Sequence, residues 1–241
     1  PFLLTSWSRS GSLVLQRNPH YHRRFRGNVD RVELTVIPHD DWTARLKMYD
    51  ADLIDLLGLS PQSIEALNLV PQRRAGEYAT IPRATTECLA FDVRRPPFDD
   101  PRVRRAFAHA VDREVMGDVA VAGYDFPATG GLVPPGIPGH SPGIAPPYDP
   151  DRARQLLVTA GYPGGAGFPQ VDALTPGGPW WHRTNEYLRA QWRENLGVDI
   201  QWPMLEWAEH LQRRNRDGAH LFRLGWIADY PSVHNFLYSL F

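Results

Sequence analysis

The segment Arg223–Pro231 carries the residues whose types and spacing best fit ligand binding. An apolar run reaches Trp226 and is followed by an aspartate and a proline turn. The carboxylate of Asp229 can accept charge-assisted hydrogen bonds from a ligand ammonium group, and Arg223, six residues upstream, can pair with a ligand carboxylate. Because α/β sheets often hold ligands at strand ends, the segment predicts a ligand-binding site.

The same residues also fit a purely structural role. Trp226 can belong to a hydrophobic core, and Asp229 can cap the turn before Pro231 without touching a ligand. The residue types alone leave both interpretations open.

Other chemistries find little support in the sequence. It contains no nucleophile elbow, zinc-protease motif, Cys-x-x-Cys pair or phosphate loop, and no nucleophile, base and orienting group that a hydrolase would need together. His20 and His22 could reach one metal ion, yet no Cys, Asp or Glu nearby completes a ligand set. The protein is therefore expected not to be an enzyme, and to hold no metal and no cofactor.

Charge and composition limit the classes of binding partner that we expect. The 241 residues include 26 Lys and Arg against 27 Asp and Glu, a net charge of -1, so nucleic acid is not an expected partner. Cys88, the single cysteine, lies in an apolar run and is expected to be a buried, unreactive thiol. No stretch approaches the roughly 20 apolar residues of a membrane-spanning helix. Small or zwitterionic ligands remain possible.

Short strands and helices alternate over the first 93 residues. Asp41 can cap a helix over 42–50, and Ser60 with Pro61 can open another. Strand patterns occur at 12–17, 31–37, 51–57, 76–82 and 86–93.

Helices dominate after the proline-rich segment 94–101. Asp99 or Asp100 can cap a helix with Pro101 in its first turn, and its apolar stripe is expected to be buried. That stripe consists of Val103, Ala106, Phe107, Ala110 and Val111. The other expected elements are a long ordered loop at 123–148, helices from Asp149 and over 182–196 and 206–216, and strands at 198–204 and 220–227. Trp207 is expected to face inward. The pattern predicts an α/β fold with a mixed sheet.

A series of motifs along the chain resembles one family. In order, these motifs are LVLQRNPHYH, GNVDRVELTVIP, RLKMYDADLIDL, LAFDVRRPPFDDPRVRRAFAHAVDREVM, YDPDRARQLLVTAGYP, NLGVDIQ, LEWAEHL and FRLGWIADYP. Through them the chain resembles the extracellular solute-binding proteins of family 5, the oligopeptide, dipeptide and nickel binding components of ABC transporters.

The resemblance implies a bilobed, periplasmic-binding-protein-like α/β fold of the peptide-binding class, incomplete here, that closes on its ligand. Residues 1–94 would form part of the first lobe and residues 95–241 most of the second. The implied partners are a short peptide or similar small solute and the permease subunits of an ABC importer. The protein would be a monomer in the periplasm or outside the cell, held at the membrane by a lipoprotein anchor or by the permease.

The resemblance also assigns ligand contacts by position in the motifs. Asp229 would hold the amino terminus of a peptide, and Arg223 would meet the ligand carboxylate. The peptide would lie extended and bond through its backbone, a form of strand addition. Backbone contacts would come from Gly225 and Ile227, and side-chain pockets would be lined by Trp226 and Trp207.

The identity of the ligand stays open at this point. Family members also take nickel chelates, haem and sugars, and a sensor domain or a degenerate domain that no longer binds would carry similar motifs. About half of a typical family chain is expected to lie beyond these residues, since the apolar ends at 1–4 and 240–241 resemble interior sequence. Exposed apolar surface is expected where the remaining parts would dock.

Overall fold

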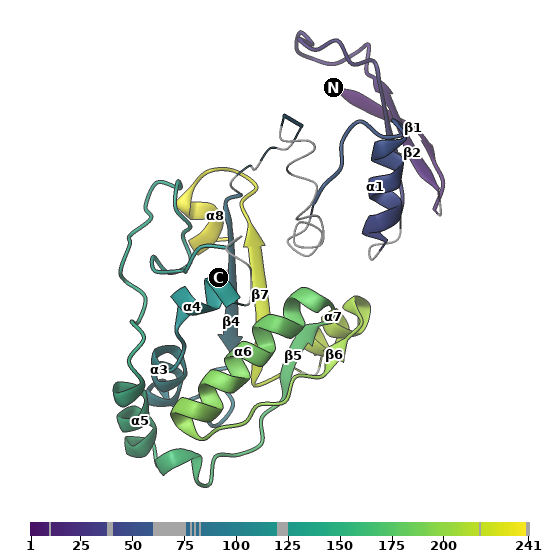
Figure 1. The fold of residues 1–241 in the computed structure, drawn as a ribbon. Coiled ribbons are helices and arrows are strands. Elements are labelled where there is room, and N and C mark those ends of the chain that lie inside the picture. Colours follow the sequence, from purple (N-terminus) through teal and green to yellow (C-terminus); the bar gives the residue numbers. More distant parts are fainter. Residues whose placement is uncertain are drawn as a thin grey trace. The chain divides into compact units, whose positions relative to one another are not determined.

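A computed structural model describes residues 1–9, 11–37, 41–59, 76–77, 79, 81, 83–119, 125–216 and 218–239 (Figure 1). Two compact units make up the chain, Pro1–Ser63 and Ile64–Phe241. The lobe boundary that the resemblance implies at residue 94 is not tested by this division into compact units, so it stays a prediction. The helix expected from Ser60 lies outside the described residues, as do residues 78, 80 and 82 of the strand expected at 76–82. The described residues of that strand, 76–77, 79 and 81, form a turn or no regular element.

A three-stranded antiparallel sheet forms most of the first unit. Its order is β1-β2-β3, with β1 at Phe2–Trp7, β2 at Ser12–Arg17 and β3 at Arg31–Thr35. The strands predicted at 12–17 and 31–37 are therefore confirmed, although the second ends two residues early. Several large apolar side chains of this sheet are exposed, namely Leu3, Leu4, Trp7 and Leu34.

Helix α1 (Trp42–Asp50) begins where the sequence predicts it, because the Asp41 side chain accepts a backbone N–H of the first turn at 2.9 Å. The strand predicted at 51–57 is wrong. The backbone N–H of Leu53 donates to the carbonyl of Met48 at 2.9 Å, so these residues form a turn that closes the helix.

A mixed four-stranded sheet organises the second unit, in the order β4-β7-β5-β6. Strand β4 (Thr85–Phe91) is antiparallel to β7 (Leu221–Ile227), whereas β5 (Ala173–Pro176) is parallel to both β7 and β6 (Met204–Leu205). Figure 1 shows that β7 continues alongside β4 beyond its contact with β5. The predicted α/β fold with a mixed sheet is confirmed.

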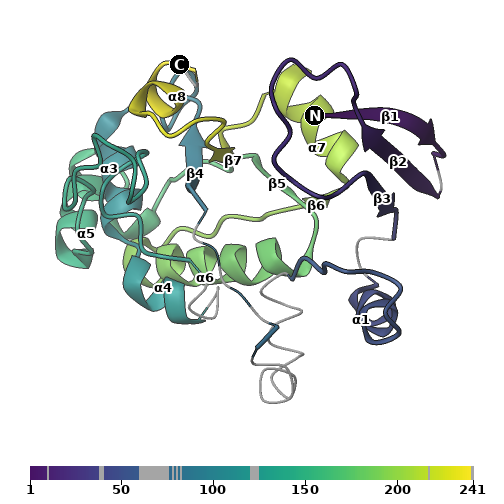
Figure 2. The ribbon, with the colours of Figure 1, turned by 90° about the horizontal axis from the view of Figure 1, so that it is seen from above.

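Helices surround this sheet. They are α3 (Pro101–His109), α4 (Arg113–Val119), α5 (Pro150–Thr159), α6 (Pro179–Leu196), α7 (Trp207–Arg216) and α8 (Val233–Leu237), with a 3-10 turn at Pro163–Gly165. Figure 2 shows α3, α4 and α5 grouped at one end of the unit, with α6 running along the sheet. In the described part, no helix is long and apolar enough to cross a membrane.

The main core of this unit lies where α3, α5 and α6 meet β4 and β7. All five residues of the stripe predicted on α3 are buried there, which confirms that expectation. Trp192 of α6 is 2% exposed and donates its indole N–H to the Phe107 carbonyl at 3.1 Å. The bond ties the Trp192 ring to the backbone of α3, beside the Phe107 ring, whose centroid lies 5.0 Å away.

Two expectations for the region after α6 are wrong. Of the strand predicted at 198–204, only Met204 forms a ladder pair among the described residues, together with the following Leu205. The backbone N–H of Val198 instead donates to the Trp192 carbonyl and closes the end of α6. In α7, Trp207 is 60% exposed, and His210 is the residue that is buried.

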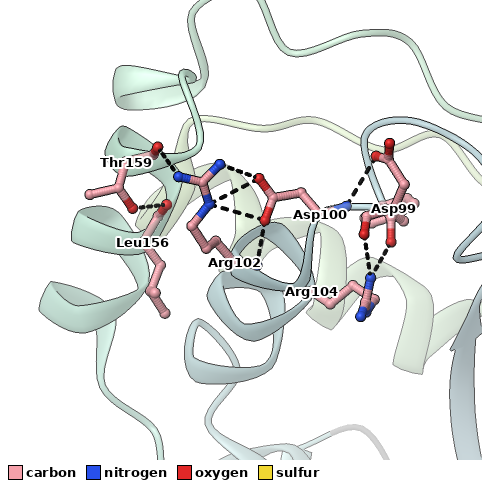
Figure 3. A network of polar contacts seen from close by, with 7 residues as sticks. Asp99, Asp100, Arg102, Arg104, Leu156 and Thr159 are labelled. Carbon is pink, nitrogen blue, oxygen red and sulfur yellow. Dashed lines mark hydrogen bonds and ion pairs between the residues drawn. The ribbon is translucent and has the colours of Figure 1, made fainter.

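An ion-pair network joins the start of α3 to the end of α5 (Figure 3). The Asp100 carboxylate caps α3 by accepting the Arg102 backbone N–H at 2.7 Å, and it also binds the Arg102 guanidinium at 2.6 Å. That guanidinium donates onward to the carbonyl of Thr159 at 2.6 Å, near the end of α5. Hydrogen bonds from Arg102 hold the pKa of Asp100 below its ordinary value.

We expect Asp100→Ala to lower the free energy of unfolding by about 1 kcal/mol, since it removes a helix cap together with the partner of Arg102. Asp151→Ala is a matched control: Asp151 is an exposed acid whose ion pair with Arg154 stays within α5, so its loss should change stability by less than about 0.5 kcal/mol. Urea unfolding measures both, and equal effects would contradict a capping role.

Asp92, directly after β4, has a side chain only 7% exposed. Its carboxylate accepts hydrogen bonds from Arg94 Nε at 2.8 Å and Nη2 at 2.9 Å. These bonds lower its pKa from the ordinary 3.8 to about 2.

We expect Asp92→Asn to destabilise the protein at neutral pH and to do so much less at pH 2. Because folding lowers this pKa, the stabilising contribution is present above the ordinary pKa of 3.8 and is lost as pH falls toward 2. Urea unfolding of both proteins from pH 7 to pH 2 should show the difference closing over that window. A difference that stays constant would mean that the charge of Asp92 is not its cause.

Candidate ligand-binding site

One edge of β7 is unpaired along its second half. Within the described strands, β5 pairs with β7 only at Leu221 and Phe222, before β5 turns toward β6. On its other side β7 pairs with β4 over its full length. Residues from Gly225 onward therefore have a strand partner on one edge and no described strand on the other.

The ladder between β4 and β7 determines which backbone groups face this open edge. Asp92 donates to His220 at 3.0 Å and Ala228 donates to Ala84 at 2.9 Å, so these two pairs are hydrogen-bonded pairs. Such pairs alternate with non-bonded pairs in an antiparallel ladder. It follows that Gly225 and Ile227 turn their N–H and C=O groups away from β4, toward the open edge.

Asp229 lies just past the end of β7, with its carboxylate exposed. Asn235, in α8, donates from Nδ2 to Asp229 Oδ2 at 3.3 Å, and its Oδ1 accepts the Asp229 backbone N–H at 3.0 Å. The same Oδ1 accepts the Trp226 indole N–H at 2.9 Å. Asn235 is 1% exposed, so a buried amide positions the exposed carboxylate.

Trp226 is half-buried, and its ring packs against a small apolar cluster formed by Val133, Ile137 and Phe236. The structural role considered from the sequence is thus present. Its assignment to a side-chain pocket stays a prediction.

Arg223 projects from the face of β7 that also carries Gly225 and Ile227. The side chain is 8% exposed, and its guanidinium lies 4.4 Å from the Trp181 ring and donates to Asn185 Oδ1 at 3.0 Å. Two further donors of this pair, Arg223 Nε and Asn185 Nδ2, are buried and have no hydrogen-bond partner in the described part of the chain. The pair therefore has donor capacity that the described residues leave unused.

Glu87 stands directly opposite Gly225 in the β4–β7 register. A Cβ atom at position 225 would overlap the Glu87 carboxylate, so the glycine allows this carboxylate to lie across β7. Any side chain at 225 would push the carboxylate away. Glu87 and Arg223 are therefore neighbours on one face of the sheet, at diagonal positions.

The charges of this face influence one another. Burial lowers the pKa of Arg223 to about 10, with Glu87 opposing the shift. Partial burial raises the pKa of Glu87 to about 6, although Arg223 opposes the change and Asp125 adds to it. Burial likewise raises the pKa of Asp125. The neighbouring Cys88 is half-buried and its pKa is raised to about 11, so it stays a neutral thiol.

Trp207 is the one predicted site residue that the interactions of the described residues do not connect to the others. It begins α7, after β6, and its ring stacks on His210 with centroids 5.7 Å apart. The remaining predicted residues, Arg223, Gly225, Trp226, Ile227 and Asp229, all belong to β7 or its end.

Sequence reasoning missed several residues of this region. Glu87 and Asn185 reach Arg223 from 136 and 38 residues away in the chain, and no local pattern marks them. Asn235 was also missed, although Ser232, which caps α8, is a recognisable helix start.

Comparison with known proteins adds an independent finding. The family model for bacterial extracellular solute-binding proteins, family 5 Middle, matches residues 1–241. The oligopeptide-binding protein OppA of Bacillus subtilis (strain 168) is 22% identical over 244 residues, which cover 98% of this chain and 44% of that protein. The probable deoxycholate-binding periplasmic protein YgiS of Escherichia coli (strain K12) is 30% identical over 249 residues, covering 99% and 44%.

Among solved structures, the murein tripeptide binding protein MppA of Escherichia coli matches with a TM-score of 0.80 and 25% identity, covering 100% of this chain and 47% of that one. The chain thus spans less than half the length of these relatives. Because the family model matches it from end to end, the chain belongs to the bacterial extracellular solute-binding proteins of family 5.

Proposed function

We propose that the protein captures short peptides outside the cytoplasmic membrane and hands them to the permease of an ABC importer, without chemistry on the peptide. Two of its relatives are named for peptide ligands, an oligopeptide for OppA and a murein tripeptide for MppA. Family membership supports solute binding in general. The case for a peptide depends on the site itself.

The observation that carries this proposal is the open edge of β7 at Gly225 and Ile227. Each residue offers one N–H and one C=O there, two residues apart, which is the spacing of alternate residues in an extended peptide. A peptide added along this edge would gain backbone hydrogen bonds that do not depend on its sequence. That suits a receptor for many peptides.

Charges at the two ends of this edge suit the termini of a peptide. Asp229 would receive the ammonium group, and Arg223, with its unpartnered Nε, would receive the carboxylate. Six residues of extended strand separate these positions, at most roughly 20 Å at about 3.3 Å per residue. This span fits peptides of about five residues or fewer, running antiparallel to β7.

A bile acid is the alternative suggested by the name of the relative YgiS, which is deoxycholate-binding. Its carboxylate could meet Arg223, but a steroid has no ammonium group for Asp229 and no amides for the edge of β7. The chemistry of these three features together favours a peptide.

We expect Asp229→Ala to weaken binding of peptides with a free amino terminus by about tenfold or more, since the ammonium group loses its anion. Calorimetric titration of di- to pentapeptides into the full-length protein measures this. N-acetylated peptides are the control and should bind both proteins weakly. Equal affinity of both proteins for the free peptides would contradict the role of Asp229, and saturable binding of deoxycholate without binding of peptides would replace the proposed ligand.

We expect Ile227→Pro to reduce peptide affinity about five- to tenfold with little change in melting temperature, because the lost N–H faces the open edge and serves no ladder bond. Leu224→Pro is the matched control. Leu224 turns its N–H toward Cys88 of β4, so this change should destabilise the fold by about 3 kcal/mol or more. Unchanged affinity of Ile227→Pro would argue against strand addition at this edge.

A further inference from the structure

The carboxylate of Glu87 has no hydrogen bond and no ion pair within the described part of the chain, although Arg223 is near enough to influence its pKa. It lies over Gly225 and so reaches across β7. Glu87 is an exposed residue of β4, so a ligand can reach its carboxylate from solvent. The carboxylate occupies the face beside the proposed peptide edge, with acceptor capacity that no described donor uses.

The charges around Glu87 do not balance. Its neighbours are Arg223 from β7, Asp125 from the loop that leads to α5, and Cys88, whose neutral thiol adds no charge. Among the described residues, two carboxylates and one guanidinium therefore influence one another. A peptide carboxylate at Arg223 would bring a third anion to this group, and a cation placed between them would relieve the repulsion.

The register of the proposed strand addition predicts which peptide residue could supply that cation. In an antiparallel arrangement with the amino terminus at Asp229, the first peptide residue pairs with Ile227 and the third with Gly225. Residues directly opposite in a ladder project their side chains on the same face. The third side chain would thus lie on the face of Glu87, and the second on the other face.

We propose that Glu87 is a specificity-determining residue that binds a lysine or arginine side chain at the third position of the bound peptide. This inference rests on the proposed function and adds a chemical preference to it. Glu87 acts on selectivity, whereas the edge of β7 and Asp229 supply binding common to all peptides.

Calorimetric titration with three tetrapeptides tests the inference on the full-length protein. They are Ala-Ala-Lys-Ala, Ala-Ala-Met-Ala, and Ala-Lys-Ala-Ala as a register control. The wild type should bind the first about tenfold more tightly than the second, a preference that Glu87→Gln should abolish. Affinity for Ala-Lys-Ala-Ala should be the same in both proteins. Equal melting temperatures would show that the substitution leaves the fold intact.

A second variant distinguishes direct contact between Glu87 and the lysine side chain from the electrostatic effect of any nearby carboxylate. Asp125→Asn removes one negative charge from the same group and should reduce the lysine preference by less than Glu87→Gln does. The preference of the wild type should also weaken as pH falls through about 6, where Glu87 takes up a proton, and Glu87→Gln should show no such change.

The outcomes are distinct. A lysine preference that survives Glu87→Gln, or that both variants reduce equally, overturns the inference. Binding of all three peptides with equal affinity by the wild type overturns the inference but leaves the proposed function standing. Binding of none of them overturns the proposed function, and the inference falls with it.

Discussion

The antiparallel pairing of β4 with β7 is the constraint on which the site depends. It brings residues 85–91 beside residues 221–227 and sets which groups of β7 face the open edge. A slip of one residue would turn the backbone groups of Gly225 toward β4 and move Arg223 to the opposite face. The end of the ladder is secured by Asp92, whose backbone N–H bonds to His220 and whose carboxylate is held by arginines.

The strand pairing also places a buried cation, Arg223, on the face of β7 that carries the candidate site. A guanidinium that is 8% exposed requires nearby partners, and the structure supplies Asn185 and the face of Trp181 from α6. Two carboxylates, Glu87 and Asp125, compensate its charge from a distance without occupying its donors. The arrangement keeps a cation buried and leaves its Nε without an acceptor among the described residues.

Local signals predicted much of the fold and only part of the site. The helix starts at Asp41, Asp100 and Asp149 were predictable because a cap acts within one turn of chain. Residues 198–203 were mistaken for a strand because alternating buried apolar residues such as Val198 and Ile200 resemble strand residues even when they form no ladder. Glu87 could not be identified from the sequence, since it comes to lie opposite Gly225 and near Arg223 only when β4 pairs with β7. Sequence-local patterns do not encode that register.

The two interpretations of the segment around Trp226 prove compatible. Alternation along β7 turns the indole away from Arg223, into the cluster with Phe236. The indole and the Asp229 backbone can each only donate, so the Asn235 atom that accepts from both must be its oxygen. The Asn235 NH₂ group is thereby directed to the Asp229 carboxylate. A tryptophan with a structural role thus orients the aspartate that we propose binds the ligand, which is why neither role alone explains this stretch of sequence.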